Sequence, residues 1–137
     1  MPFFVTRRLH FSAGHRLHSP AFSDEENRRI YGKCNNPAGH GHNYWLEVTV
    51  AGPKDPVTGM VVDLKALDDI VRVRVLEDVD HASLNDDVAW LRGIVPTTEN
   101  LAEAFWNRLK DHVPAPGSLH EIRVLETEKN FVAYRGG

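Results

Sequence analysis

Alternation of apolar and polar residues predicts two β-strands in the first half of the chain, at residues 3–13 and 42–51. Apolar side chains occupy mainly odd positions in the first strand and even positions in the second. His42 therefore shares the apolar face of the second strand with Tyr44. The Pro, Gly and Asp residues at 52–59 are typical of a turn. Residues 60–63 are therefore expected to continue the hairpin.

Helical spacing replaces alternation in the middle of the chain. Asp63 is a suitable N-cap for a helix at 64–78, and Thr97 or Thr98 for a second helix at 98–112. Residues 79–96 have no regular pattern. The polar segment 16–39 reads as a long loop with a short helix starting near Ser23, and two more strands are expected at 119–128 and 130–135.

The predicted order is β-β-α-α-β-β in one domain spanning residues 1–137. Strands and helices that do not alternate singly favour an α+β fold with an antiparallel sheet of four strands. Such a sheet leaves two open edges, which must be covered or paired. Oligomerisation through these edges is one solution.

Composition narrows the class of protein. The chain has 137 residues, 42% of them hydrophobic, and a net charge of -3, so no overall charge favours nucleic acid or a membrane surface. A single cysteine excludes an intrachain disulfide, and the N-terminus lacks the apolar run of a secretory signal. We expect a cytoplasmic protein.

Two histidines separated by one glycine form the sharpest local motif, His40-Gly41-His42. Residues i and i+2 of a strand point to the same face, so the two imidazoles can converge on one ion. His15, at the end of the first strand, can join them if the two strands pair. Catalytic zinc commonly has three protein ligands and one open position. The alternative is that all three are ordinary loop or strand-end histidines.

Three other sites carry candidate chemistry. Cys34 lies six residues before His40, and its thiol is either a base or nucleophile or a small buried apolar group. Asp80-His81 is either a polarising pair or a surface dipeptide. Glu126 shares a strand face with apolar residues, where a carboxylate needs a donor. That donor is either a buried ion-pair partner or a ligand with two adjacent N–H groups.

Six segments together resemble the 6-pyruvoyl-tetrahydropterin synthase family, and the resemblance is closest to its animal-type members. They appear in the family's order and cover nearly the whole chain. The segments are Phe11–His15, Tyr31–Tyr44, Asp55–Met60, Val79–His81, Thr97–Asn100 and Val124–Thr127.

The resemblance implies a T-fold (tunnelling-fold) subunit with two helices on one face of the sheet. Three such subunits close a β-barrel in the family, two trimers form a homohexamer, and active sites lie at subunit interfaces. The implied reaction converts 7,8-dihydroneopterin triphosphate to 6-pyruvoyl-tetrahydropterin, a step of tetrahydrobiopterin biosynthesis, with elimination of triphosphate. Oxidation of the side chain offsets reduction of the ring, so the reaction needs no redox cofactor.

The resemblance also implies a role for each matching residue. His15, His40 and His42 are similar to the family's zinc ligands, and Cys34 to its proton-abstracting base. Asp80 and His81 correspond to a relay partner of that base, and Glu126 to the pterin anchor, which is also counted in the relay. The implied pocket wall comprises Thr97, Thr98 and Glu99, and the candidate cations for the triphosphate are Arg7, Arg8, Arg16 and Lys33.

Two positions depart from the family pattern, Gly14 and Val79, and neither removes a proposed functional group. The nearest alternative is the 6-carboxy-tetrahydropterin synthase of queuosine biosynthesis, which shares the fold and metal triad. Its cysteine usually lies four residues before the first histidine, whereas the gap from Cys34 to His40 is six. An alternative of another class is a non-catalytic pterin- or metal-binding module, which would not need both a base and a relay.

Overall fold

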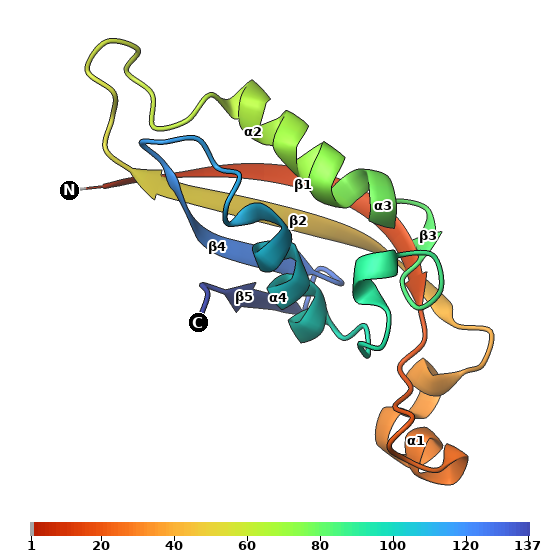
Figure 1. Cartoon of the computed structure of the whole chain (residues 1–137). Helices are drawn as coiled ribbons and strands as arrows, with labels where there is room; N and C mark the ends of the chain where they lie inside the picture. The colour runs from red at the N-terminus through yellow and green to blue at the C-terminus, as the bar shows by residue number, and fades with distance from the viewer. Residues whose placement is uncertain (1) are drawn as a thin grey trace.

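One curved five-stranded sheet dominates the computed structural model, which describes residues 2–137. Its strand order is β3-β1-β2-β4-β5; the neighbours are antiparallel except for β1 and β3. Figure 1 shows the helices gathered along one side of the sheet, with α1 beyond its far end. The strands are β1 (Phe3–His15), β2 (His40–Gly52), β3 (Ala82–Ser83), β4 (Ser118–Leu125) and β5 (Phe131–Tyr134).

Three helical regions accompany the sheet. The first is α1 (Asp24–Tyr31), followed by the 3₁₀ helix η1 (Gly32–Asn35). The second is continuous and includes a π-helical turn: α2 (Leu64–Val71), η2 (Arg72–Leu76) and α3 (Glu77–Val79). A short 3₁₀ helix η3 (Ala89–Leu91) precedes the third region, α4 (Thr98–Leu109).

The long β1–β2 ladder determines which side chains face the helices. It runs without a break from Phe3 opposite Gly52 to His15 opposite His40. Strand alternation then places Phe11 and Tyr44 on the same face, where their rings stack 4.7 Å apart. Phe105 of α4 packs edge-on against Phe11, so the core lies between this face and the helices.

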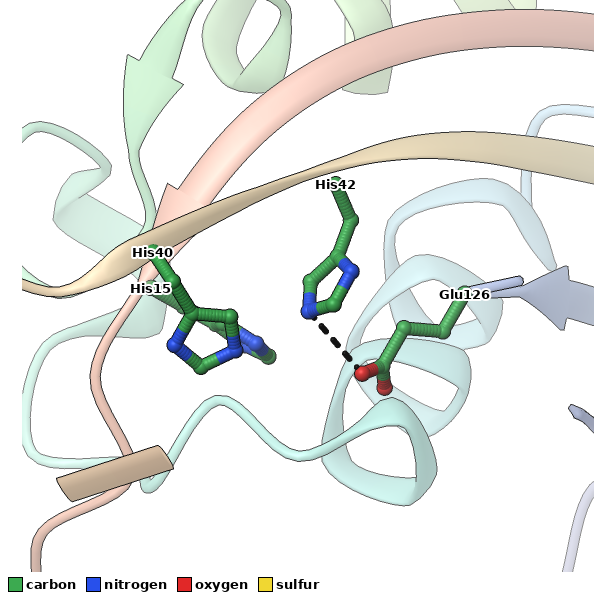
Figure 2. A group of neighbouring side chains, drawn as sticks. All are labelled: His15, His40, His42 and Glu126. Carbon is green, nitrogen blue, oxygen red and sulfur yellow. Dashed lines mark ion pairs between the residues drawn. The ribbon is translucent and has the colours of Figure 1, made fainter. Parts of the chain in front are cut away.

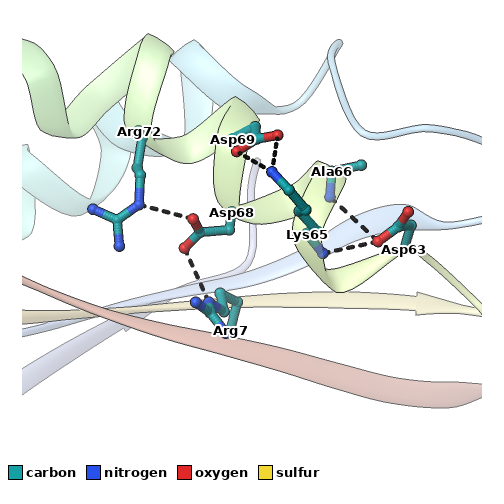
Figure 3. Close-up of polar contacts among 7 residues, drawn as sticks. All are labelled: Arg7, Asp63, Lys65, Ala66, Asp68, Asp69 and Arg72. Carbon is teal, nitrogen blue, oxygen red and sulfur yellow. Dashed lines mark hydrogen bonds and ion pairs between the residues drawn. The ribbon is translucent and has the colours of Figure 1, made fainter.

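Side-chain caps begin both long helices as the sequence predicts. The Asp63 carboxylate accepts from the N–H groups of Lys65 and Ala66, which Figure 3 shows, and the Thr97 hydroxyl accepts from Asn100 N. Each cap satisfies N–H groups that have no partner within the helix. The predicted α+β class and helix positions are confirmed, with the second helix ending at Leu109 rather than at residue 112. The sheet has five strands with one parallel pair, rather than the four antiparallel strands expected.

The prediction that residues 60–63 continue a hairpin with 42–51 is wrong. The edge of β2 away from β1 is paired with β4, so it offers no ladder to a returning strand. The Asp55 carboxylate accepts from Val57 N and Thr58 N and closes the loop. Val61 and Val62 are both buried, which strand alternation does not permit against a single core face.

The two-residue strand β3 is an addition to the four predicted strands, within a segment expected to be irregular. It pairs with the end of β1 and holds residues 80–83 beside the histidine-bearing strands. Among the described residues, no helix combines the length and apolar character needed to cross a bilayer.

Candidate metal and substrate site

Three imidazoles converge where β1 ends and β2 begins. Because His15 pairs directly with His40, and His42 lies two residues further along β2, all three side chains point to the same face. The ring centroids are 4.7 Å apart for His15–His40, 4.7 Å for His40–His42 and 5.1 Å for His15–His42. The geometry expected from strand phase is therefore present.

A glycine keeps this corner compact. Gly39 precedes His40 and has a φ of 74°, which glycine adopts without steric cost. A Cβ at this position would lie 3.2 Å from the backbone oxygen of His15. A side chain there would push the two histidine-bearing strands apart.

Each imidazole presents one buried nitrogen that makes no hydrogen bond in residues 2–137: His15 Nε2, His40 Nδ1 and His42 Nε2. The last of these contacts the Glu126 carboxylate as an ion pair. The other nitrogen of His15, Nδ1, lies 2.8 Å from the carbonyl oxygen of Pro96. Since a carbonyl only accepts, Nδ1 carries the proton and Nε2 presents its lone pair. A backbone carbonyl commonly fixes a metal-binding histidine in this way.

Burial is the main electrostatic influence on these groups. It lowers the pKa of His15, despite the opposing hydrogen bond to Pro96, and it also lowers the pKa of His42, despite the nearby Glu126 carboxylate. Both rings therefore stay neutral to lower pH than an exposed histidine. The neutral imidazole is the form that binds a metal, so the donor set fits a metal ion.

Glu126 stands directly after β4 and reaches the same cluster. Its Oε1 lies 3.0 Å from His42 Nε2, and its Oε2 accepts a hydrogen bond of 2.5 Å from the Thr98 hydroxyl. The three histidines and Glu126 each offer a ligand atom within 4.8 Å of the others. Figure 2 shows His42 between Glu126 and the His15–His40 pair. The cluster can therefore bind a metal ion with or without the carboxylate.

Cys34 lies next to the cluster. It is half-buried in η1, where it lines a small cavity with Lys33, Asn36 and His40. The Leu17 N–H donates to the Cys34 carbonyl at 2.8 Å and ties this turn to the segment after β1. Cys34 and His40 are therefore neighbours at one cavity.

The Asp80–His81 pair is in a different place. The Asp80 carboxylate accepts from Ser12 N and from His81 Nδ1. Burial is the largest single influence and would raise the pKa of Asp80, but these contacts together outweigh it, so the pKa is lowered. Ser12 and Asn43 hydrogen-bond on the face opposite the imidazoles. His81 has a φ of 61° and an 82% exposed side chain. No hydrogen bond or ion pair within residues 2–137 joins the pair to Cys34.

The remaining predicted substrate residues are only partly brought together. Thr98 is buried and bonded to Glu126, whereas Thr97 caps α4 and Glu99 is exposed on its first turn. The sequence did not single out two further groups that orient the site, Pro96 and Tyr44, whose hydroxyl lies 3.3 Å from His15 Nδ1. Tyr44 lies on the histidine face of its strand, which is a signal that could have identified it.

The central strands of this α+β sheet end in three imidazoles, each with a buried nitrogen that makes no hydrogen bond among the described residues. This arrangement defines a protein with a candidate metal centre beside cavities of substrate size. The profile of the family described as 6-pyruvoyl tetrahydropterin synthase matches residues 4–137, and the chain belongs to this family.

Individual relatives agree with this assignment. The 6-pyruvoyl tetrahydrobiopterin synthase of Poecilia reticulata is 52% identical over 134 residues, covering 97% of this chain and 90% of the relative. The solved structure of the Caenorhabditis elegans 6-pyruvoyl tetrahydropterin synthase superposes with a TM-score of 0.95 at 42% identity, covering 100% of this chain and 97% of that one. A 6-carboxy-5,6,7,8-tetrahydropterin synthase of Aquifex aeolicus is 28% identical over 152 residues, covering 92% of this chain and 90% of the relative.

Proposed function

We propose that the chain is a lyase that converts 7,8-dihydroneopterin triphosphate to 6-pyruvoyl-tetrahydropterin and releases triphosphate. The observation that carries the proposal is the cluster of His15, His40, His42 and Glu126, in a chain 52% identical to a 6-pyruvoyl tetrahydrobiopterin synthase. A metal-binding module without catalysis would not account for Cys34 beside the same cluster.

The metal that we propose is zinc, held by His15, His40 and His42. An all-imidazole donor set suits zinc, and three ligands leave one position for substrate. When bound, the ion supplies a Lewis acid that makes the hydroxyls of the substrate side chain more acidic. Pro96 holds the His15 ring in the ligating tautomer, which supports this assignment.

Glu126 is proposed to bind the pterin ring. Its carboxylate can accept two adjacent N–H groups of the pterin edge, and the Thr98 hydroxyl donates to one of its oxygens and fixes its orientation. Thr97, Thr98 and Glu99 are proposed as parts of the wall around the ring. Fixing the ring brings the side chain of the substrate beside the histidines and Cys34.

Cys34 is proposed as the base that removes a carbon-bound proton from the substrate side chain. Loss of that proton permits β-elimination, in which the carbon–oxygen bond to the triphosphate breaks. Asp80 and His81 are proposed as the relay that moves the proton onward. Because the pair lies at the β1–β3 edge of the sheet without a contact to Cys34 among the described residues, we propose that it belongs to the active site of a neighbouring subunit.

The proposed assembly is therefore a homohexamer, a dimer of trimers with sites between subunits. Its support in this chain is the pair of sheet edges and the separation of Cys34 from His81. A cytoplasmic location stays a prediction from the sequence.

The pyruvoyl product is favoured over the carboxy product by two observations. The 52% identical relative is a pyruvoyl enzyme, and the carboxy enzyme described above is 28% identical. The spacing of six residues between Cys34 and His40 agrees with the same choice.

The proposal is tested by incubating the zinc-loaded protein with 7,8-dihydroneopterin triphosphate and identifying the products by mass spectrometry. We expect 6-pyruvoyl-tetrahydropterin and one triphosphate for each substrate consumed. Formation of carboxy-tetrahydropterin and acetaldehyde would instead identify the chain as the 6-carboxy-tetrahydropterin synthase of queuosine biosynthesis. Absence of turnover by zinc-loaded protein would favour the binding module.

A further inference from the structure

A cavity of about 660 Å³ is lined by His15 and His40 but not by Glu126. The cavity lies between the segment after β1, the turn before β2 and the residues after β3. The lining residues beyond the two imidazoles include Arg16, His18, Ser83, Asn85 and Asp86. The roles proposed above leave this cavity without an occupant.

Arg16 is firmly held at this cavity. Its N–H donates to Asn85 Oδ1 at 2.7 Å, and Asn85 Nδ2 donates to its carbonyl at 2.8 Å, so one amide side chain clamps its backbone. Its Nε donates to the Asn35 carbonyl at 3.0 Å. Within residues 2–137, no carboxylate forms an ion pair with Arg16. The two terminal guanidinium nitrogens are thus available to an anion.

The other candidate cations for the triphosphate either form ion pairs with carboxylates or lie at another cavity. Arg7 pairs with Asp68 at 3.0 Å on the side of α2, and Arg8 pairs with Glu47 at 3.1 Å. Lys33 is exposed and lines the smaller cavity of Cys34 rather than this one. Arg16 therefore lines the cavity beside the histidine cluster without an ion-pair partner among residues 2–137.

We propose that Arg16 binds the triphosphate of the substrate in this cavity, an inference that rests on the proposed function. In dihydroneopterin triphosphate, the reacting side chain connects the ring to the triphosphate, so the two groups lie on opposite sides of the reacting carbons. Figure 2 shows His15 and His40 beyond His42 as seen from Glu126, and both line the cavity that Arg16 also lines. With the ring at Glu126 and the side chain at the imidazoles, the triphosphate would therefore extend toward this cavity. A planar guanidinium suits phosphate oxygens because it donates in pairs.

His18 supplies a second donor to the cavity. Asn35 Nδ2 lies 3.1 Å from His18 Nδ1, and because the amide nitrogen donates, that ring nitrogen accepts. The neutral ring therefore carries its proton on Nε2. Asp86 is an exposed carboxylate among the residues that line the cavity. It accepts a hydrogen bond from the Ser83 hydroxyl at 3.2 Å.

The anion site is joined to the base. Asn35 follows Cys34 directly, accepts from Arg16 Nε and donates to the Leu17 carbonyl at 2.7 Å. Occupation of the cavity by triphosphate thus fixes the same turn that carries the thiol. Arg16 therefore binds the triphosphate through its charge, and it positions Cys34 through its hydrogen bond to Asn35 in the same turn.

Inorganic tripolyphosphate tests the anion site directly, since its binding can be titrated whether or not the protein turns substrate over. Arg16→Gln is expected to weaken tripolyphosphate binding and raise KM by roughly 10- to 100-fold. Binding of 7,8-dihydroneopterin, which lacks phosphate, should be unchanged. Arg28→Gln, on the exposed face of α1, is the matched control and should leave all three values unchanged.

Arg16→Lys keeps the charge and provides a second variant if Arg16→Gln does not fold. It should bind tripolyphosphate more weakly than the unaltered protein but more tightly than Arg16→Gln, because an ammonium cannot donate as a planar pair. Unchanged tripolyphosphate affinity in either variant would overturn the proposal. An equal loss of dihydroneopterin binding would also overturn it, since it would indicate general disruption. If the unaltered protein binds tripolyphosphate through Arg16 but does not turn the substrate over, the proposed function is refuted while the anion site stands.

Discussion

The two oxygens of Glu126 have different neighbours, and this difference bears on its role. One oxygen lies 3.0 Å from His42 Nε2, and the other accepts from the Thr98 hydroxyl. If the carboxylate were a fourth metal ligand, the centre would be closed. If it binds the pterin ring, the metal keeps an open position.

Glu126→Gln separates these two roles. The amide keeps the shape but loses the charge and one acceptor, so we expect full metal content and roughly 10- to 100-fold weaker binding of 7,8-dihydroneopterin. Metal content is measured by elemental analysis and pterin binding by calorimetry. Thr98→Val is a useful comparison, with a smaller loss of pterin affinity. Loss of the metal from Glu126→Gln would show that the carboxylate is a ligand.

Cys34→Ala tests the base. We expect this variant to keep its metal, because the thiol is not one of the clustered ligand groups, and to lose turnover by roughly 10²- to 10⁴-fold. Cys34→Ser is the matched variant of similar size, and its weakly acidic hydroxyl should restore little activity. Steady-state kinetics at saturating metal measure the effect. Full activity in Cys34→Ala would remove the thiol from the mechanism.

At the residue scale, the sequence predicts the metal cluster better than its surroundings. Strand phase and a two-strand ladder are enough to place His15 opposite His40. The contact of His15 with Pro96 depends on a loop far along the chain and leaves no periodic signal. The same holds for the Asn85 clamp on Arg16, which joins residues separated by 69 positions.

At the scale of elements, Asp68 links α2 to the sheet. Its carboxylate accepts from Arg72 one helical turn ahead and from Arg7 on β1, at 2.8 and 3.0 Å, as Figure 3 shows. The hydrogen bond from Arg72 is the largest influence, and together with Arg7 it lowers the pKa of Asp68. The folded state therefore favours the charged carboxylate.

Asp68→Asn should cost about 1 kcal/mol of unfolding free energy at pH 7, because both contacts are partly exposed. Because the pKa of Asp68 is lower in the folded state, its carboxylate stabilises the folded protein at pH values above the unfolded-state pKa, near 4. This stabilisation is lost as the pH falls through the folded-state pKa. Denaturant unfolding at pH 7 and at acidic pH measures the difference. Asp69→Asn is the control, because the exposed Asp69 carboxylate pairs with the exposed Lys65 side chain. An Asp68→Asn deficit that persists undiminished in acid would contradict the account.

Element types were easier to predict than their connections. Caps at Asp63 and Thr97 and helical spacing predict both long helices, whereas the π-helical turn Arg72–Leu76 has no sequence signal that we identified. The error at residues 60–63 arose because a turn motif does not reveal which neighbour takes the edge of a strand. Here β4, a strand some 70 residues further along, takes it.

At the scale of the whole molecule, the sheet has exposed edges and exposed aromatic groups. Phe3, Phe4 and Phe131 are between 50% and 57% exposed. The proposed relay pair Asp80–His81 lies at the β1–β3 edge of the sheet and makes no hydrogen bond or ion pair with Cys34 among residues 2–137. Both features are explained if copies of the chain join edge to edge and complete each other's sites.

Mixing two inactive variants tests this assembly. Cys34→Ala and His81→Ala should each be inactive as pure hexamers, but hexamers refolded from a mixture should regain turnover, because some interfaces then combine an intact Cys34 with an intact His81. Light scattering measures whether each preparation is a hexamer, and activity is measured before and after mixing. Verified mixed hexamers without turnover would place all these residues in one subunit's site.

The central claim is an open metal centre made by His15, His40 and His42. Crystals of the zinc-loaded protein, measured on both sides of the zinc absorption edge, test it most directly. We expect one anomalous peak per chain at about 2.0–2.1 Å from one nitrogen of each histidine, with Glu126 outside the coordination shell. A peak elsewhere, or a closed shell that includes the Glu126 carboxylate, would contradict the account.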